Sequence, residues 1–341
     1  MPQSVCAHQP EQRQCEDDQW FTIGKTIMSA RTVVVTGCSS GIGLALAVKL
    51  AKDQLKRFKV VATMRDLDKK KRLEDAAGNT LNDTLEIKEL DVCSEDSICK
   101  CVNSIPERKV DILVNNAGMG LIGPVECQSL DTMKTVFDTN FFGLARLVKE
   151  ILPDMKSRQN GHIVVTSSVM GIHGLLFNDV YSASKFAVEG FCESLAIQAL
   201  KFNINISLIE PGPVFTEFES KLYEDAAKMD LSSTDEETAK MFQQLYLPYS
   251  KKVFHALGQT AEDVAEHTVK VITSKNPPFR YQTNNLYTPL TTLKFADPTG
   301  NTHVDTFYKM VFEHGRIFNT SLNLIKLLRW RSRNNPGGKH S

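Results

Sequence analysis

Short runs of β-branched residues alternate with longer amphipathic stretches over most of this chain, and this alternation restricts its fold more than any other feature. Runs such as Val-Val-Val at 33–35 and Ile-Val-Val at 163–165 are continuously apolar, which is typical of strands buried on both faces. Such strands belong to parallel sheets that are covered by helices on both sides. The alternation therefore predicts an α/β fold, a single Rossmann-type domain with a doubly wound parallel sheet.

The same patterns predict where the elements lie. Strands are expected at 32–36, 59–63, 85–90, 111–115, 162–167, 205–210 and 280–283. Helices are expected at 42–53, 67–77, 94–104, 130–158, 180–202 and 261–274. We interpret the helical, mixed-charge residues 216–257 as a lid over a substrate and expect irregular structure from Tyr287 to Ile317. The domain then spans residues 30–285, between a disordered extension (1–29) and a C-terminal appendage (286–341).

Charge and cysteine content exclude several classes of protein. The 40 basic and 40 acidic residues balance, which gives no electrostatic reason to bind nucleic acid. The eight cysteines form no CxxC pair, so we expect no metal site and reduced thiols in a cytosol-facing protein. No apolar run is long enough to span a membrane, and residues 1–29 lack the apolar core of a secretory signal.

Three glycines stand between the first predicted strand and the first predicted helix, in the segment Thr-Gly-Cys-Ser-Ser-Gly-Ile-Gly at 36–43. Glycine allows a tight turn and a close approach of the backbone to a pyrophosphate. The helix N-terminus adds free N–H groups and a positive dipole. The segment predicts a dinucleotide cradle, with an ordinary glycine-rich turn as the alternative; its residues are Gly37, Ser39, Ser40, Gly41, Ile42 and Gly43.

The end of the second predicted strand indicates which dinucleotide binds. An acidic residue there would accept the ribose 2′-hydroxyl of NAD and repel a 2′-phosphate. This position holds Thr63, and Arg65 follows where its guanidinium can pair with a phosphate. Asp66 argues against this interpretation, although it lies past the strand end and can cap the next helix. The sequence therefore predicts NADP(H).

Four polar residues form a candidate catalytic set. Tyr181 and Lys185 are four residues apart, which places them on one face of a helix, where the ammonium would lower the pKa of the phenol. Ser168 follows a predicted strand and could hydrogen-bond a substrate oxygen, and Asn140 could hold a water that links Lys185 to solvent. Each residue alone has an ordinary structural explanation. Together, downstream of a nucleotide cradle, they predict an oxidoreductase.

With Asn-Asn-Ala-Gly at 115–118, Tyr-Ser-Ala-Ser-Lys at 181–185 and Pro-Gly-Pro-Val-Phe-Thr at 211–216, the chain resembles the short-chain dehydrogenase/reductase family over residues 30–285. The resemblance implies that Tyr181 is the general acid/base, that Lys185 tunes it and binds the ribose, that Ser168 contacts the substrate oxygen and that Asn140 relays protons. It also implies cofactor contacts from Asp91, Val92, Asn116, Ala117, Gly118, Pro211, Gly212, Val214 and Thr216.

A narrower resemblance, carried by segments such as Phe-Asp-Thr-Asn-Phe-Phe-Gly at 137–143, is to the branch of retinol and 17-beta-hydroxysteroid dehydrogenases. It implies NADPH-dependent reduction of all-trans-retinal to all-trans-retinol, or alternatively a steroid substrate, by a homodimer joined through 130–158 and 180–202. Met241 aligns with a substrate-recognising histidine of the steroid enzymes and is expected to contact an apolar polyene instead. A non-catalytic NADP-binding regulator is the alternative from another class.

The last 26 residues, 316–341, carry arginine and lysine but no acidic residue, among apolar residues and Trp330. Such a segment can lie in a membrane interface, and a helix packed on its own domain is the alternative. We expect peripheral membrane association on the cytoplasmic side, in the photoreceptor outer segment if the resemblance to retinol dehydrogenases holds. The segment has no cysteine that could carry palmitate, because the last one is Cys192.

Overall fold

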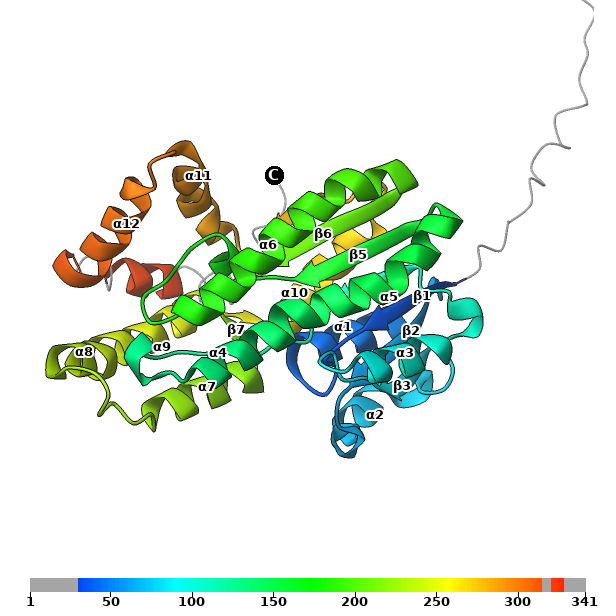
Figure 1. The fold of residues 1–341 in the computed structure, drawn as a ribbon, viewed down its shortest axis with the longest axis horizontal. Coiled ribbons are helices and arrows are strands. Elements are labelled where there is room, and N and C mark those ends of the chain that lie inside the picture. The colour runs from blue at the N-terminus through cyan, green and yellow to red at the C-terminus, as the bar shows by residue number, and fades with distance from the viewer. Residues whose placement is uncertain (1–29, 315–319, 328–341) are drawn as a thin grey trace, which may run out of the picture.

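A seven-stranded parallel sheet forms the centre of the computed structural model, which describes residues 30–314 and 320–327 (Figure 1). The strand order is β3-β2-β1-β4-β5-β6-β9. The strands are β1 (Arg31–Val35), β2 (Phe58–Met64), β3 (Leu85–Glu89), β4 (Ile112–Asn115), β5 (Gly161–Thr166), β6 (Ile204–Glu210) and β9 (Arg280–Gln282). This confirms the predicted fold and places every strand within a residue of its expected bounds. The expected extension at 1–29 lies outside the described residues.

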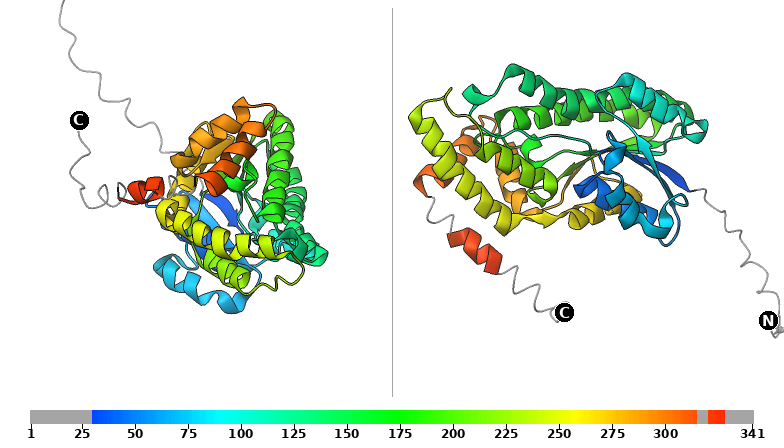
Figure 2. Two further views of the ribbon diagram at one scale, coloured as in Figure 1. Left: turned by 90° about the vertical axis from the view of Figure 1, so that its left-hand side faces the viewer. Right: turned by 90° about the horizontal axis from the view of Figure 1, so that it is seen from below.

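Helices bury both faces of the sheet. On one face, α1 (Gly41–Ala51), α2 (Lys71–Ala77) and α10 (Ala261–Thr273) share a core with β1 and β2. On the other face, α3 (Glu95–Asn103), α5 (Gly143–Arg158) and α6 (Asp179–Ala199) enclose a second core. The right-hand view of Figure 2 shows the sheet between the green helices above and the blue and yellow helices below. Burial on both faces explains why the strands are continuously apolar.

The helix expected at 130–158 is interrupted. The structure has α4 (Leu130–Phe137), a π-helical turn at Asp138–Phe142, and then α5. Asn140 lies in this turn, where its side chain accepts a hydrogen bond from Met119 N at 2.8 Å and donates one to Met119 O at 2.9 Å. Two bonds to one backbone residue hold the wider turn in place, because buried polar groups need partners.

Residues 216–257, which we interpret as a lid, follow β7 (Val214–Phe215) and contain α7 (Glu217–Ala227), α8 (Glu236–Lys240), a π-helical turn at Met241–Tyr246, and α9 (Leu247–Leu257). β7 pairs with β8 (Gln259–Thr260), which closes the lid at its base. Figure 1 shows α7, α8 and α9 at the same end of the molecule as α11 and α12. The lid and the appendage therefore gather at one end of the domain.

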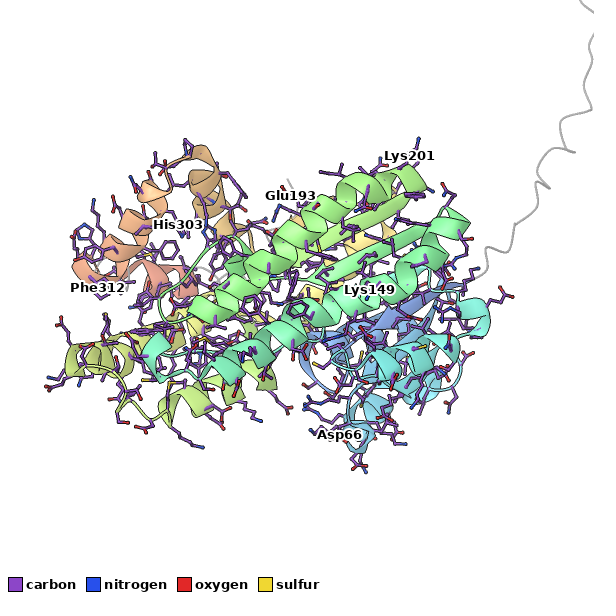
Figure 3. All side chains as sticks on the ribbon, in the orientation of Figure 1. Asp66, Lys149, Glu193, Lys201, His303 and Phe312 are labelled. Carbon is purple, nitrogen blue, oxygen red and sulfur yellow. The ribbon has the colours of Figure 1, made fainter. Side chains whose placement is uncertain are left out.

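The prediction of irregular structure from Tyr287 to Ile317 is wrong for the described residues. The appendage contains α11 (Thr288–Ala296), α12 (Asn301–Tyr308) and a π-helical turn at Lys309–Glu313. Pro289 occupies the first turn of α11, where its missing N–H costs nothing, and Asp297 accepts hydrogen bonds from Thr299 N and Thr302 N before α12. Figure 3 labels His303 and Phe312 on this appendage. Of the helices in the described ranges, none has the length and apolar character that crossing a bilayer would require.

Candidate active site

A cavity of about 1100 Å³ opens at the carboxyl ends of the strands. Its walls include residues within two positions of the ends of six of them: Gly37 after β1, Arg65 after β2, Asp91 after β3, Asn116 after β4, Ser167 after β5 and Pro211 after β6. The chain reverses direction across the sheet between β1 and β4, and ligands of doubly wound sheets bind at this point. The volume exceeds the roughly 300–1,000 Å³ typical of a site for one small ligand, which leaves room for a cofactor and a substrate.

The glycine segment has the geometry of a phosphate cradle. Gly37 and Gly41 have φ of +72° and +58°, which residues with a side chain rarely adopt. A Cβ on Gly43 would lie 2.3 Å from Gly37 O and 2.5 Å from Asn116 Nδ2, so α1 can start this close to β1 only at a glycine. No acidic side chain occupies the first turn of α1, and Ser40 makes no side-chain cap there, which leaves its N–H groups available to a pyrophosphate.

Asn116 joins the ends of three strands. Its Nδ2 donates to Thr36 O at 3.0 Å, and its Oδ1 accepts from Thr166 Oγ1 at 3.2 Å. Thr36 Oγ1 in turn accepts hydrogen bonds from the backbone N–H groups of Asn116 and Ala117, each at 3.0 Å. The floor of the cavity is therefore held rigidly at the ends of β1, β4 and β5.

Arg65 lies at the outer end of the cavity. Its side chain is exposed, and no ion pair involving it is found in the described part of the chain. Asp66, in contrast, points away to local partners: it accepts a hydrogen bond from Asp68 N at 3.0 Å and pairs with Lys69 at 3.2 Å. The expectation that Asp66 caps the following turn is confirmed.

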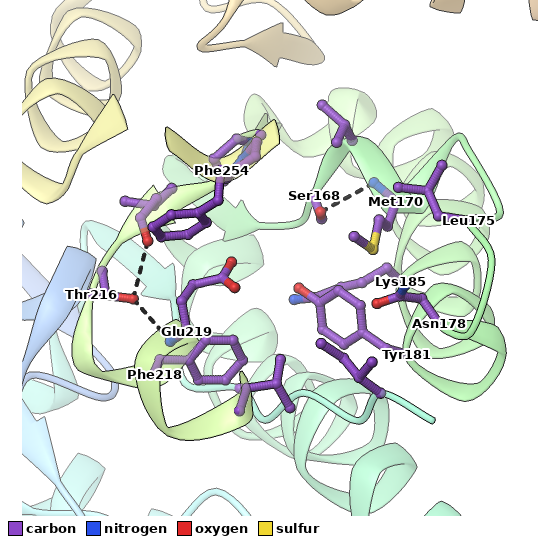
Figure 4. A pocket seen from close by; sticks show the side chains of 18 of the residues that line it. Ser168, Met170, Leu175, Asn178, Tyr181, Lys185, Thr216, Phe218, Glu219 and Phe254 are labelled. Carbon is purple, nitrogen blue, oxygen red and sulfur yellow. Dashed lines mark hydrogen bonds between the residues drawn. The ribbon is translucent and has the colours of Figure 1, made fainter. Parts of the chain in front are cut away.

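The catalytic candidates meet at the middle of the cavity (Figure 4). Lys185 Nζ lies 5.8 Å from the centre of the Tyr181 ring and donates to Thr166 O at 2.9 Å. The Tyr181 hydroxyl points into the cavity, on the side where Ser168 also lies. Asn140 stands behind them: its Nδ2 donates to Ser184 Oγ at 2.9 Å, and Ser184 Oγ donates to Tyr181 O at 2.7 Å.

The chain also matches the family model of short chain dehydrogenases over residues 31–227, which include every one of these catalytic candidates. It belongs to this family. The dehydrogenase is 57% identical to retinol dehydrogenase 8 of Homo sapiens over 86% of this chain and 94% of that protein. It is 45% identical to 17-beta-hydroxysteroid dehydrogenase type 1 of Homo sapiens, over 83% of this chain and 87% of that protein.

A solved structure shows the same fold with a nicotinamide cofactor. The short chain dehydrogenase/reductase from Burkholderia phymatum, in complex with NAD, is similar to this dehydrogenase with a TM-score of 0.66. The two are 25% identical, and the match covers 79% of this chain and 94% of the other. The cradle described above therefore stands in a fold that holds such a cofactor in a relative.

Burial dominates the protonation of the catalytic pair in the dehydrogenase. It raises the pKa of Tyr181, with a smaller contribution from the Glu219 carboxyl, while a hydrogen bond with Ser168 acts in the opposite direction. Burial also lowers the pKa of Lys185 to about 8, against the effect of Glu189. The expected lowering of the Tyr181 pKa by Lys185 stays a prediction, and the phenol of this structure keeps its proton. A proton donor for a carbonyl requires that form.

A buried ion network lies behind Lys185. Arg280 of β9 pairs with Glu189 of α6 and also with Glu210 at 3.1 Å and Glu193 at 2.9 Å. Glu189 accepts a hydrogen bond from Ser167, the residue before Ser168. Burial raises the pKa of Glu210 to about 7, although Arg280 acts against it. The network joins the catalytic helix to the edge of the sheet, and sequence patterns indicated none of it because its members are far apart in the chain.

The end of the cavity between the lid and the appendage is largely apolar and aromatic. Its walls come from the loop after β5, the lid and the appendage, and include Met170, Leu175, Phe218, Leu222, Val253, Phe254, Leu257, Leu286, Leu290, Phe307, Met310, Val311, Leu322 and Ile325. Tyrosines 223, 246, 249 and 287 add hydroxyl groups to the same walls. The contribution of the appendage was missed because that segment was expected to be irregular.

Most of the residues selected from the sequence line the cavity, with three exceptions. Gly43 supports the cradle from behind, and Asn140 supports the catalytic helix. Met241 packs against the aromatic cluster around Phe242 and is not among the cavity-lining residues, which removes it as a substrate contact. Glu219, which does line the cavity, was not selected, because an acidic residue in the first turn of a helix is ordinarily explained by the helix dipole.

Proposed function

We propose that this dehydrogenase reduces all-trans-retinal to all-trans-retinol with NADPH. The observation that carries the proposal is one continuous cavity, which runs from the glycine cradle past Tyr181 to a largely apolar end between the lid and the appendage, of the character that a long isoprenoid requires. Identity of 57% to retinol dehydrogenase 8 supports the same substrate.

The residues present fit the proposed chemistry. When bound, the nicotinamide supplies a hydride to the carbonyl carbon, and in the reverse reaction it takes one from the alcohol. Ser168 donates a hydrogen bond to the carbonyl oxygen, and Tyr181 delivers the proton that converts this oxygen to a hydroxyl. Lys185 stabilises the phenolate that remains, and Asn140 holds the path along which the proton is replaced.

A Tyr181→Phe variant separates an enzyme from a non-catalytic NADP-binding regulator. We expect turnover to fall by about 10²–10⁴-fold, with nucleotide binding retained because the ring and Lys185 stay in place. Unchanged turnover would remove Tyr181 from the mechanism. A wild-type protein that binds NADPH but reduces neither retinoid nor steroid would support the regulator.

A steroid is the second candidate substrate, favoured by 45% identity to 17-beta-hydroxysteroid dehydrogenase type 1. Because Met241 does not line the cavity, its identity no longer argues against a steroid. A competition assay with NADPH, all-trans-retinal and estrone in one reaction decides between the two. We expect retinol to be the main product, and preferential formation of estradiol would reverse the assignment.

The choice of NADP(H) over NAD(H) rests on Arg65, whose exposed guanidinium lines the cofactor end of the cavity. Replacing Arg65 with alanine should raise the dissociation constant of NADPH by about tenfold or more, because a charge-assisted pair with the 2′-phosphate is lost. Binding of NADH should not change. Arg72→Ala is the matched control, because Arg72 is also exposed but pairs with Glu217. Equal loss of both nucleotides in the Arg65 variant would contradict the assignment.

The proposal includes peripheral membrane contact, on the cytoplasmic side and in the photoreceptor outer segment. Leu286, Tyr308 and Phe312 are exposed and also line the cavity, so its rim is apolar. In the tail, helical residues 320–327 bury Leu322 against the domain but expose Leu324 and Leu327. Deletion of 316–341 should release the protein from liposomes, and continued sedimentation with lipid would refute the role of the tail. Immunolocalisation in retina tests the proposed location in the photoreceptor outer segment.

We also propose a homodimer joined through α5 and α6. Three large apolar residues are each 40–77% exposed in this region: Phe142 beside α5, and Phe186 and Ile197 of α6. Such exposure is unusual on one side of a monomer. Light scattering should give twice the mass of the chain. Ile197→Asp should produce monomers, and a wild-type protein that is already monomeric would contradict the proposal.

A further inference from the structure

The carboxyl group of Glu219 stands inside the cavity, opposite the catalytic residues. Glu219 belongs to the first turn of α7, and Figure 4 shows its carboxyl group pointing toward the side where Tyr181 and Lys185 lie. In the described part of the chain this carboxyl has no ion pair, and burial raises its pKa to about 7. Glu219 is half-buried, and a carboxyl group that is partly removed from water without a cation is destabilised, so a cationic ligand beside it would compensate this cost.

The place of the nicotinamide ring follows from the residues around Glu219. A Cβ on Gly41 of the cradle would touch Thr216 Cγ2 at 3.2 Å, and the Thr216 hydroxyl caps the backbone N–H of Glu219. The first turn of α7 is therefore packed on the cradle. A nicotinamide carried by the cradle and facing Tyr181 would lie in the part of the cavity between Tyr181 and Glu219, beside the Glu219 carboxyl.

We propose that Glu219 distinguishes the two redox states of the nicotinamide, since its carboxylate attracts the cationic oxidised ring and has no such attraction for the neutral reduced ring. Binding of NADP⁺ would favour the ionised carboxylate, and binding of NADPH, which buries the group further, would favour the protonated form. Linkage is reciprocal, so the preference for NADP⁺ over NADPH rises with pH as Glu219 ionises. This inference rests on the proposed function only through cofactor binding, not through the substrate.

Other titratable groups face the same cavity, and their pKa values set the range in which Glu219 acts alone. Burial lowers the pKa of Lys185 to about 8 and that of His173 to about 4, and it raises the pKa of the tyrosines nearby. Of these groups, Lys185 begins to lose its proton toward pH 7.5, and the Glu219→Gln variant retains that contribution. The titratable and charged groups that line the cavity are Tyr181, Lys185, Tyr223, Tyr246, Tyr249, Tyr287 and His173, with Arg65, Asp91 and Asp138 toward the cofactor end. The 2′-phosphate also titrates, but it is common to both nucleotides and cancels in the ratio of their dissociation constants.

The test measures the dissociation constants of NADPH, by its fluorescence, and of NADP⁺, by displacement, from pH 5.5 to 7.5. In the wild-type protein the ratio of the NADPH constant to the NADP⁺ constant should rise by about fivefold or more over this range, toward the tenfold limit that a change of one unit in the pKa of Glu219 sets. In Glu219→Gln the ratio should be lower and independent of pH. Glu217→Gln, two residues away in the same turn but exposed, should behave like the wild-type protein.

The outcomes separate the possible explanations. A ratio that is flat in the wild-type protein, or that rises equally in Glu219→Gln, overturns the proposal. Equal weakening of both nucleotides in Glu219→Gln, with the pH trend retained, would show a merely structural role in the lid and also overturns it. A wild-type protein that binds neither nucleotide would instead refute the proposed function. Because glutamine resembles the protonated carboxyl, the variant should unfold at the wild-type temperature.

Discussion

Replacing Gly43 with alanine measures how closely the glycine cradle is packed. The added Cβ would lie 2.3 Å from Gly37 O and 2.5 Å from Asn116 Nδ2, and neither neighbour is the end of a flexible chain. The Asn116 amide holds Thr36 O at 3.0 Å and ties β4 to β1. The methyl group must therefore displace either the cradle backbone or this amide.

The size of the effect on the free energy of unfolding follows from one stabilising and two destabilising contributions. Alanine in place of glycine inside a helix gains about 1 kcal/mol. Overpacking costs about 1–3 kcal/mol, and leaving the Asn116 amide without its bond costs about 1–3 kcal/mol. The net destabilisation should be about 1–5 kcal/mol, and NADPH should bind at least about tenfold more weakly because the phosphate site is itself displaced.

Urea unfolding followed by circular dichroism, together with NADPH titration, checks both values. Gly190→Ala is the matched control: Gly190 lies within α6, and a Cβ there meets nothing within 4 Å. This control should be as stable as the wild-type protein or up to about 1 kcal/mol more stable. If Gly43→Ala unfolds at the wild-type urea concentration and binds NADPH as tightly, the steric reasoning about the cradle is wrong.

Three further predictions concern the network and the appendage. Burial holds the pKa of Glu210 at about 7, above the ordinary 4.5, so its contribution to stability is complete below pH 4.5 and is lost as pH rises through 7. Urea unfolding should show this fall in the wild-type protein, and Glu210→Gln should flatten it. The pKa of His173 is lowered to about 4, so its contact with His303 at 3.4 Å is stable above pH 6.5 and weakens on acidification. Proteolysis of the appendage should be faster at pH 5 than at pH 7.5, and equal rates would contradict this. Leu322→Ser should raise the KM for retinal several-fold, because Leu322 is 3% exposed and lines the cavity, whereas Leu324→Ser at 55% exposure should not.

The sheet and the cradle could be predicted because their local sequences carry the physical cause. A strand buried on both faces must be apolar throughout, as Val33, Val34 and Val35 are, and a turn with positive φ beside a phosphate selects glycine. The expected Tyr181–Lys185 pair is likewise local, because helical spacing alone brings the two residues together.

Other features depend on contacts between distant segments. The π-helical turn at Asp138–Phe142 is held by Asn140 bonding to Met119, and nothing in the periodicity of 130–158 reveals that partner. The pKa of Tyr181 reflects how much protein surrounds it, which a pair of residues cannot indicate. The short helices of the appendage were missed although Pro289 signals a helix start, because each has too few turns to show a clear period.

The cavity wall between the lid and the appendage has a consequence for how the substrate preference of such an enzyme evolves. The part of the chain that matches the family model ends at residue 227, whereas Val253, Leu290, Met310 and Leu322 all lie beyond it. The residues that we propose to carry out hydride and proton transfer thus lie in one part of the chain. Much of the cavity wall that would contact the substrate lies in another. Mutations of these lining residues can change the fit of a substrate without altering Tyr181, Lys185 or Ser168, so the two functions can evolve at different rates. Exchange of the appendage, residues 286–341, between related dehydrogenases would be a direct way to transfer substrate preference as a unit.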